Sequence, residues 1–237
     1  MMVRLGNFLF RYRNGLFPFF YVLLFVPSPD VFADYRIAVA IGLSIAGCGQ
    51  IIRAATIGLA YIVRGGKDRQ VYARNLVQEG IFAHCRNPLY LGNFLVLCGL
   101  GFAANSVLFL VAGIPLFGLA YAAIIAAEEN YLRGKFNGEY DDYCARVNRF
   151  LPRLRGLGAT LQSMEFKWRR LLVKEYGSAY AWMAGMLLLT LKNLWGTPGP
   201  AVWTIEGLLG VLTLGYLIVR YLKKRKIIVA DSVNQGA

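Results

Sequence analysis

The sequence of 237 residues has few side chains that could hold a metal ion or form disulfides. It contains one histidine, His84, and four cysteines that include no CxxC pair. Zinc sites require several His or Cys ligands at characteristic spacings, and disulfide frameworks require cysteines that can pair. The cysteines are Cys48, Cys85, Cys98 and Cys144. We therefore predict no metal site and no disulfide.

Acidic residues are also scarce: 13 Asp and Glu stand against 26 Lys and Arg, which gives a formal net charge of +13. Such a charge raises the question of nucleic-acid binding. The basic residues, however, lie beside apolar segments and are not gathered on one soluble face. We expect anionic lipid headgroups as the partner and no nucleic acid.

Long polar segments are nearly absent, since residues 128–177 form the only one. The residues are 57% apolar and the mean hydropathy is +0.47, values typical of membrane proteins. Six segments are apolar enough to span a bilayer: residues 15–33, 37–63, 89–104, 106–127, 178–195 and 201–219. The first lacks a small-residue cleavage site, so we expect it to stay in the mature protein. The expected fold is an all-α polytopic transmembrane bundle of about six spans.

The placement of basic residues agrees with an even number of spans. Of the 26 basic residues, 23 lie in residues 1–14, 64–86, 128–177 and 220–226, which are alternate loops of a six-span protein. Cytoplasmic loops collect Lys and Arg, so both termini are predicted to be cytosolic, in an integral protein of a bacterial inner membrane.

Three regions are expected along the chain: N-terminal transmembrane helices in 1–65, a core with a cytosolic segment in 66–155, and C-terminal helices in 156–237. In the last region, the stretch MEFKWRRLLVKEYG is typical of a helix lying in the membrane interface.

A tight turn around Ala104 and Asn105 makes the third and fourth spans antiparallel neighbours. Their cytosolic ends are residues 86–90 and 128–131. The hairpin therefore brings a basic cluster and a pair of carboxylates close together.

The motif RNPLYLG could bind a carboxylate at the start of the third span. Asn87 can cap the helix and Pro88 suits its first position, so its unpaired N–H groups face an incoming anion. Arg86 adds a bidentate donor, Tyr90 adds a hydroxyl, and Gly92 leaves room for a ligand. The alternative is an ordinary basic flank and an ordinary helix start.

Glu128 and Glu129 are expected to end the fourth span, where an ionised carboxylate near hydrocarbon costs roughly 2 to 3 kcal/mol unless it is paired or hydrated. A cationic ligand such as a sulfonium would explain them, and so would a helix end that reaches the headgroups. Arg53, with Gln50 in the second span, also needs a partner, and Glu128 or Glu129 could be it in a structural role.

Three other polar residues are weaker candidates. His84 and Cys85 precede Arg86 and could act as a proton acceptor and a nucleophile, although an interfacial role is the simpler interpretation. Glu206 lies near the opposite interface in the sixth span, where it is expected to extend toward the headgroups.

The blocks GIFAHCRNPLYLG and EENYLRGKFNGEYDDYCARVNRFLP, within 80–152, resemble the isoprenylcysteine carboxyl methyltransferase and phospholipid methyltransferase superfamily of membrane enzymes. The resemblance implies an S-adenosylmethionine cofactor. It places Arg86, Pro88, Tyr90 and Gly92 in the first cofactor block, with Asn87 among them, and Glu128 and Glu129 in the second. Tyr140, Tyr143, Arg149 and Pro152 match the later pattern of the family.

Two departures from the family pattern stand out. The sequence has Phe136-Asn137-Gly138 where many members have FG, which shifts the positions that follow. Asn87 stands where the prenylcysteine enzymes have histidine, which argues against a prenylcysteine substrate more than against the cofactor.

We therefore expect an S-adenosylmethionine-dependent methyltransferase acting at the cytosolic face on a lipophilic acceptor in the membrane, either a lipid or a prenylated small molecule. The predicted catalytic residues are Glu129, Arg86 and Tyr90. A carboxylate acceptor needs no base, whereas an amine or hydroxyl would lose a proton to Glu129 or a tyrosine.

Two alternatives remain at this point. One is a nicotinamide-dependent membrane reductase that shares the same core. The other is a non-enzymatic scaffold in which Arg53, Glu128 and Glu129 form an ion-pair network. A cavity flanked by Arg86 and Glu129 would favour an enzyme, and direct pairing of the two without a cavity would favour a scaffold.

Overall fold

The structure is a computed structural model that describes residues 1–59, 64–67, 70–73, 75–197 and 199–229. Short 3-10 and π-helical turns join its helices, and two strands form an antiparallel hairpin. The helices and strands are α1 (Met2–Tyr21), η1 (Val22–Phe25), α2 (Tyr35–Leu59), β1 (Arg64–Lys67), β2 (Gln70–Ala73), η2 (Gly80–Ala83), α3 (Pro88–Ala103), η3 (Phe109–Gly113), α4 (Ile114–Phe136), α5 (Gly138–Arg146), α6 (Leu157–Gln162), α7 (Trp168–Asn193) and α8 (Pro200–Lys224).

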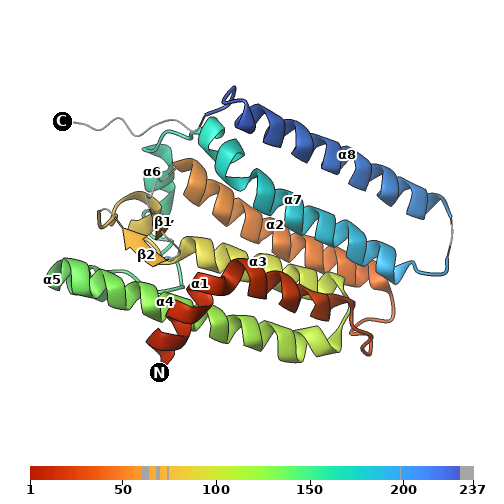
Figure 1. The fold of residues 1–237 in the computed structure, drawn as a ribbon, viewed down its shortest axis with the longest axis horizontal. Coiled ribbons are helices and arrows are strands. Elements are labelled where there is room, and N and C mark those ends of the chain that lie inside the picture. Colours follow the sequence, from red (N-terminus) through yellow and green to blue (C-terminus); the bar gives the residue numbers. More distant parts are fainter. Residues whose placement is uncertain (60–63, 68–69, 74, 198, 230–237) are drawn as a thin grey trace.

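Six long helices, α1, α2, α3, α4, α7 and α8, run side by side, and the hairpin, α5 and α6 gather at one end of them (Figure 1). Within the described residues, three helical stretches are long and apolar enough to cross a membrane: Tyr35–Leu59, Phe109–Phe136 and Pro200–Lys224. The apolar helix α3 is shorter. The molecule is thus a helical membrane protein, and the count of six spans remains a prediction.

Glycines allow α2 and α3 to lie in backbone contact. A Cβ atom added at Gly42 would lie 2.5 Å from the carbonyl oxygen of Gly99, and one added at Gly49 would lie 2.6 Å from that of Gly92. Small residues at such contacts let helices approach closely, which is how they associate where lipid removes the hydrophobic driving force. The helices α2 and α3 therefore form one rigid pair, against which α7 packs.

A second pair is formed by α1 and α4. Gly6 of α1 meets the backbone of Ala123, and further along the pair Phe17 packs edge-on against Phe117 and Tyr121. The bundle therefore has two walls, one made by α1 and α4 and the other by α2, α3 and α7.

The walls meet at the end of the bundle opposite α5 and α6. There Asn105, in a left-handed conformation (φ 52°), turns the chain from α3 into η3, as expected for antiparallel neighbours. Its buried amide accepts from the N–H groups of Val31 and Phe32 and donates to the Phe32 carbonyl. Lys192 of α7 donates to the carbonyls of Leu24, in η1, and Ala104, just after α3. This side chain therefore links the two walls at their closed end.

Several predicted boundaries were wrong. The first helix spans Met2–Tyr21 rather than starting near residue 15, and it continues through Pro18. The fourth helical stretch extends to Phe136, so Glu128 and Glu129 lie within it and not at its end. The stretch predicted to lie in the membrane interface does not form a helix of its own: from Trp168 on it forms the first turns of α7, which runs unbroken to Asn193. The strand hairpin was not expected in an all-α fold.

Candidate functional site

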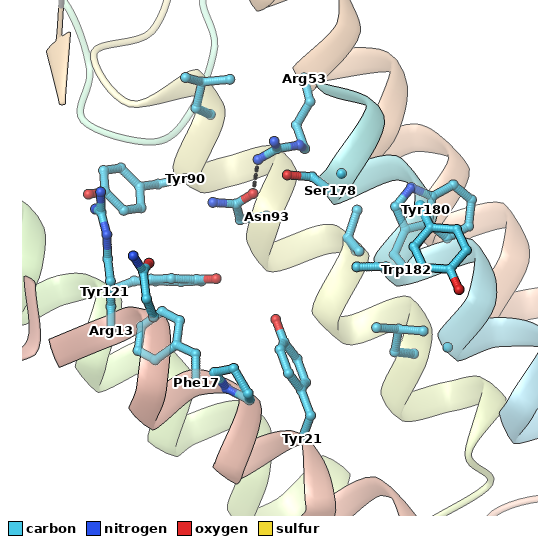
Figure 2. Close-up of a pocket in the computed structure, with 18 of the residues that line it drawn as sticks. Arg13, Phe17, Tyr21, Arg53, Tyr90, Asn93, Tyr121, Ser178, Tyr180 and Trp182 are labelled. Carbon is cyan, nitrogen blue, oxygen red and sulfur yellow. Dashed lines mark hydrogen bonds between the residues drawn. The ribbon is translucent and has the colours of Figure 1, made fainter. Parts of the chain in front are cut away.

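A cavity of about 1120 Å³ lies between the two walls, lined by residues of α1, α2, α3, α4 and α7. In Figure 2, Tyr90 and Tyr121 face it from one side and Arg53 and Ser178 from the other. Ligand pockets for small molecules are usually about 300–1,000 Å³, so this cavity is at the upper end of the sizes that such pockets have.

The start of α3 contributes Arg86, Asn87 and Pro88 to this cavity. Pro88 is the first helical residue and Asn87 precedes it without capping the helix through its side chain. Within the described part of the chain, two buried polar atoms lack a hydrogen-bond partner: Nε of Arg86 and Oδ1 of Asn87. Buried polar groups are nearly always paired, so these two atoms keep hydrogen-bonding capacity that no described residue uses.

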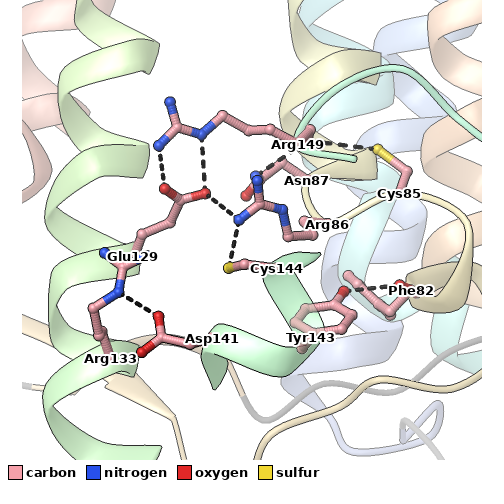
Figure 3. Close-up of polar contacts among 10 residues, drawn as sticks. All are labelled: Phe82, Cys85, Arg86, Asn87, Glu129, Arg133, Asp141, Tyr143, Cys144 and Arg149. Atoms are coloured by element: carbon pink, nitrogen blue, oxygen red, sulfur yellow. Dashed lines mark hydrogen bonds and ion pairs between the residues drawn. The ribbon is translucent and has the colours of Figure 1, made fainter. Parts of the chain in front are cut away.

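Glu129 forms a buried ion-pair cluster beside this segment (Figure 3). Its carboxylate accepts two hydrogen bonds from Arg149, and Nη1 of Arg86 lies 3.3 Å from its Oε1 atom. Arg86 Nη1 also donates to the sulfur of Cys144 at 2.6 Å. The hydrogen bond with Glu129 raises the pKa of Arg149 above its ordinary value. Glu129 therefore fixes the position of Arg86 and Arg149. Arg86 both pairs with Glu129 and lines the cavity.

Glu128, the adjacent carboxylate, lines the cavity itself. It accepts a hydrogen bond of 2.8 Å from the Tyr90 hydroxyl and is only 7% exposed. Tyr90 packs edge-on against Tyr121, with ring centroids 5.6 Å apart. Of the predicted pair of carboxylates, Glu128 thus faces the cavity and Glu129 pairs with arginines.

Arg53 pairs with Glu175 of α7, and the expectation of Glu128 or Glu129 as its partner was wrong. Two hydrogen bonds of 2.6 Å join the guanidinium to the Glu175 carboxylate, and Gln50 donates to the same carboxylate at 3.2 Å. Arg53 also donates to Asn93, and Trp182 donates to Gln50 at 2.7 Å. The scaffold network expected from Arg53, Glu128 and Glu129 is therefore not formed.

Other predicted site residues lie away from the cavity. Gly92 packs against α2, because a Cβ there would lie 2.6 Å from Cγ of Arg53. Tyr140 and Tyr143 are buried in a cluster with Ala73, Leu132 and Val147. The Tyr143 hydroxyl donates to the Phe82 carbonyl at 2.8 Å. The structure therefore gives these tyrosines a packing role and does not test contact with a cofactor.

His84 and Cys85 are also buried among protein groups. Both ring nitrogens of His84 are engaged, one with the Arg153 carbonyl at 2.7 Å and the other with the Thr160 hydroxyl at 2.9 Å. Burial raises the pKa of the Cys85 thiol, which makes it a poor nucleophile. Among the described residues, no group of three or more His, Cys, Asp or Glu side chains is placed to hold a metal ion.

The sequence interpretation missed several residues of the cavity: Tyr21, Asn93, Tyr121 and the α7 residues Lys174 and Ser178. The tyrosines and the asparagine look like ordinary residues of apolar spans. Glu175, which positions Arg53, could have been found from the sequence. It is the one acidic residue between Glu165 and Glu206, and an isolated carboxylate in a largely apolar segment indicates a buried partner.

The fold and the cavity together define a helical membrane protein with charged side chains between two helix walls. The family model described as phospholipid methyltransferase matches residues 36–139, which include α2, α3 and α4. Among curated proteins, the nickel-cobalt-cadmium resistance protein NccN of Alcaligenes xylosoxydans xylosoxydans is 31% identical over 156 residues, which cover 63% of this chain and 69% of the relative.

The cobalt-zinc-cadmium resistance protein CzcN of Cupriavidus metallidurans is also 31% identical, over 159 residues that cover 63% of this chain and 68% of the relative. No solved structure matches the chain significantly. The chain belongs to the isoprenylcysteine carboxyl methyltransferase and phospholipid methyltransferase superfamily.

Proposed function

We propose that the protein is an S-adenosylmethionine-dependent methyltransferase acting on a lipophilic acceptor in the membrane. The observation that carries the proposal is the cavity at the start of α3, where buried atoms of Arg86 and Asn87 lack partners beside the carboxylate of Glu128. The membership of a methyltransferase family supports it. The names of the two relatives concern metal resistance and do not identify an acceptor.

The residues at this end of the cavity fit the two charged groups of the cofactor. Arg86 and the N–H groups of the first turn of α3 suit its carboxylate. Glu128, held by Tyr90, suits its cationic centre. Asn87 has an amide oxygen left for a donor such as an ammonium or a hydroxyl group. When bound, the cofactor supplies an electrophilic methyl group.

The chain's own residues align the reactants and exclude water. Phe17, Val96, Leu100 and Leu188 give the deeper cavity an apolar lining that suits the body of a lipid. Transfer of a methyl group is an in-line displacement, which depends mainly on holding donor and acceptor in line in a dry site. The Glu129 cluster keeps Arg86 in place for this purpose, so we assign Glu129 a positioning role in place of the predicted catalytic one.

A proton must leave if the acceptor atom is an amine or a hydroxyl. The Tyr90–Glu128 pair faces the cavity and is our candidate for the base. With a carboxylate acceptor the same pair would only position the cofactor.

Binding of S-adenosylmethionine to the purified full-length protein, measured by calorimetry, tests the proposal. Arg86→Ala and Glu128→Gln should each weaken binding by about tenfold or more, equivalent to about 1.4 kcal/mol. Glu206→Gln, which removes a carboxylate on α8 remote from the cavity, is the matched control and should bind as wild type does. Wild-type protein that is folded but binds no cofactor at millimolar concentration would overturn the proposal.

A further inference from the structure

A second group of polar side chains lies deeper in the same cavity. Tyr21 at the end of α1, Asn93 in α3 and Tyr121 in α4 point toward one another across it (Figure 2). Asn93 is five residues beyond Pro88, about 7.5 Å further along α3, and Tyr121 is seven residues before Glu128, about 10 Å along α4. This group therefore lies deeper than the charged end of the cavity, which it meets where Tyr121 packs against Tyr90.

The two tyrosine hydroxyls make no hydrogen bond with any residue that the structure describes. Tyr121 is 7% exposed, Tyr21 is partly buried, and both line the cavity between the helices. Hydroxyls in such surroundings normally find a partner, because an unpaired polar group away from water costs free energy.

Asn93 presents its amide N–H groups to the cavity. A guanidinium can only donate, so the amide oxygen of Asn93 must face Arg53, and its NH₂ group points the other way. Figure 2 shows this orientation, with the Asn93 nitrogen turned toward the open space. Glu175 holds Arg53 through two hydrogen bonds and so fixes the amide.

The group thus offers three sets of hydrogen-bond donors, since the amide oxygen of Asn93 is engaged by Arg53 and its NH₂ group is left to donate, while the two phenol oxygens can donate as well as accept. A carbonyl or ester oxygen complements these donors, since it accepts from several of them at once. An apolar chain without oxygen would leave the donors unpaired, and sites built to hydrogen-bond a polar group discriminate strongly against analogues that lack it.

We propose that Tyr21, Asn93 and Tyr121 form an oxygen-binding subsite that holds a carbonyl or ester oxygen of the acceptor, whose apolar body fills the deeper cavity. This inference rests on the proposed function and narrows its substrate class to lipids that carry such an oxygen within reach of their methyl-accepting group. The three side chains are assigned as specificity-determining residues.

Two probes of nearly the same shape test the subsite: 2-acetylnaphthalene and 2-isopropenylnaphthalene, in which a CH₂ group replaces the carbonyl oxygen. Their binding to the full-length protein is measured by equilibrium dialysis against matched empty micelles, without cofactor. Wild type should bind the ketone about fivefold more tightly than the alkene, in keeping with one or two neutral hydrogen bonds. The double variant Tyr21→Phe/Tyr121→Phe should lose that preference.

Tyr221→Phe, which alters an exposed tyrosine on α8, is the matched control and should keep the preference. The single variants Tyr21→Phe and Tyr121→Phe should each show an intermediate preference for the ketone. They replace the double variant in the test if that protein does not fold. Equal binding of both probes by wild type, or an unchanged preference in the double variant, would overturn the inference. The probe experiment contains no cofactor, and its variants retain Arg86 and Glu128. It therefore tests the subsite alone, whereas the calorimetry of S-adenosylmethionine tests the cofactor site.

Discussion

Glu128 and Glu129 face different partners because an α-helix turns about 100° per residue. One lines the cavity and the other pairs with Arg86 and Arg149. The sequence predicted that adjacent carboxylates in a span need partners, but it could not divide their roles. The division depends on the rotation of α4 within the bundle and on the return of the chain at Arg149, 20 residues later.

The need of Arg53 for a partner was likewise predictable, whereas the identity of that partner was not. Glu175 is 122 residues away in the chain and reaches Arg53 only because α7 packs on α2. Its side chain is 4% exposed. The free energy of this pair is therefore open to a direct test.

Glu175→Gln should destabilise the protein strongly, because it leaves the Arg53 charge buried without its counter-ion. Breaking a buried pair by removing one partner typically costs about 3–5 kcal/mol. Thermal unfolding of the detergent-solubilised protein measures the effect. Asp141→Asn, which breaks the exposed pair with Arg133, should cost less than about 1 kcal/mol. Similar losses in the two variants would contradict the assignment of Glu175.

Helix α3 was predicted closely, since NP marks its start and a short turn its end. The helices α4 and α7 are longer than the apolar segments predicted within them, because both continue into polar sequence. Hydropathy marks the part of a helix that lies in lipid and not the helix itself. Close contact between α2 and α3 depends on glycines whose partners only the packing reveals.

Two substitutions in α2 test that contact. Gly42→Ala should lower stability by about 1–3 kcal/mol, because its methyl group would overlap the backbone of Gly99. Gly47→Ala meets nothing within 4 Å and should be neutral or stabilising by up to about 1 kcal/mol. The midpoints of thermal unfolding give the comparison, and equal midpoints would argue against close packing of the two helices.

The molecule as a whole places its charge at one end. The hairpin, α5, α6, the start of α1 and the end of α8 lie at this end (Figure 1). Residues 1–14, 128–177 and 220–226, which form or adjoin these helices, contain 18 of the 26 basic residues. This arrangement agrees with the pattern expected of a protein whose basic end faces the cytosol.

The orientation gives a prediction for reporter fusions in bacterial cells. Green fluorescent protein fused after Ala237 should fluoresce and alkaline phosphatase at the same position should be inactive, because both report a cytosolic terminus. A fusion at Thr197, between α7 and α8, should give the reverse. An active phosphatase at the C-terminus would mean an odd number of spans or an inverted protein.

The cavity combines helices inside and outside the family match. The matched residues 36–139 supply Arg86 and Glu128 of the cavity, whereas α1 and α7, outside the match, add Arg13 and Lys174 and complete its walls. Sequence comparison therefore indicates the proposed chemistry, and the fold is needed to see where an acceptor would lie.

Transfer of a labelled methyl group tests the central claim most directly. Membranes containing the full-length protein are incubated with methyl-tritiated S-adenosylmethionine, and the radioactivity that extracts into chloroform is counted against membranes with Arg86→Ala or Glu206→Gln protein. We predict label in the lipid extract with wild type and Glu206→Gln, and at least about tenfold less with Arg86→Ala. Lipid label no higher with wild type than with Arg86→Ala at equal protein levels would contradict a methyltransferase acting on a membrane lipid.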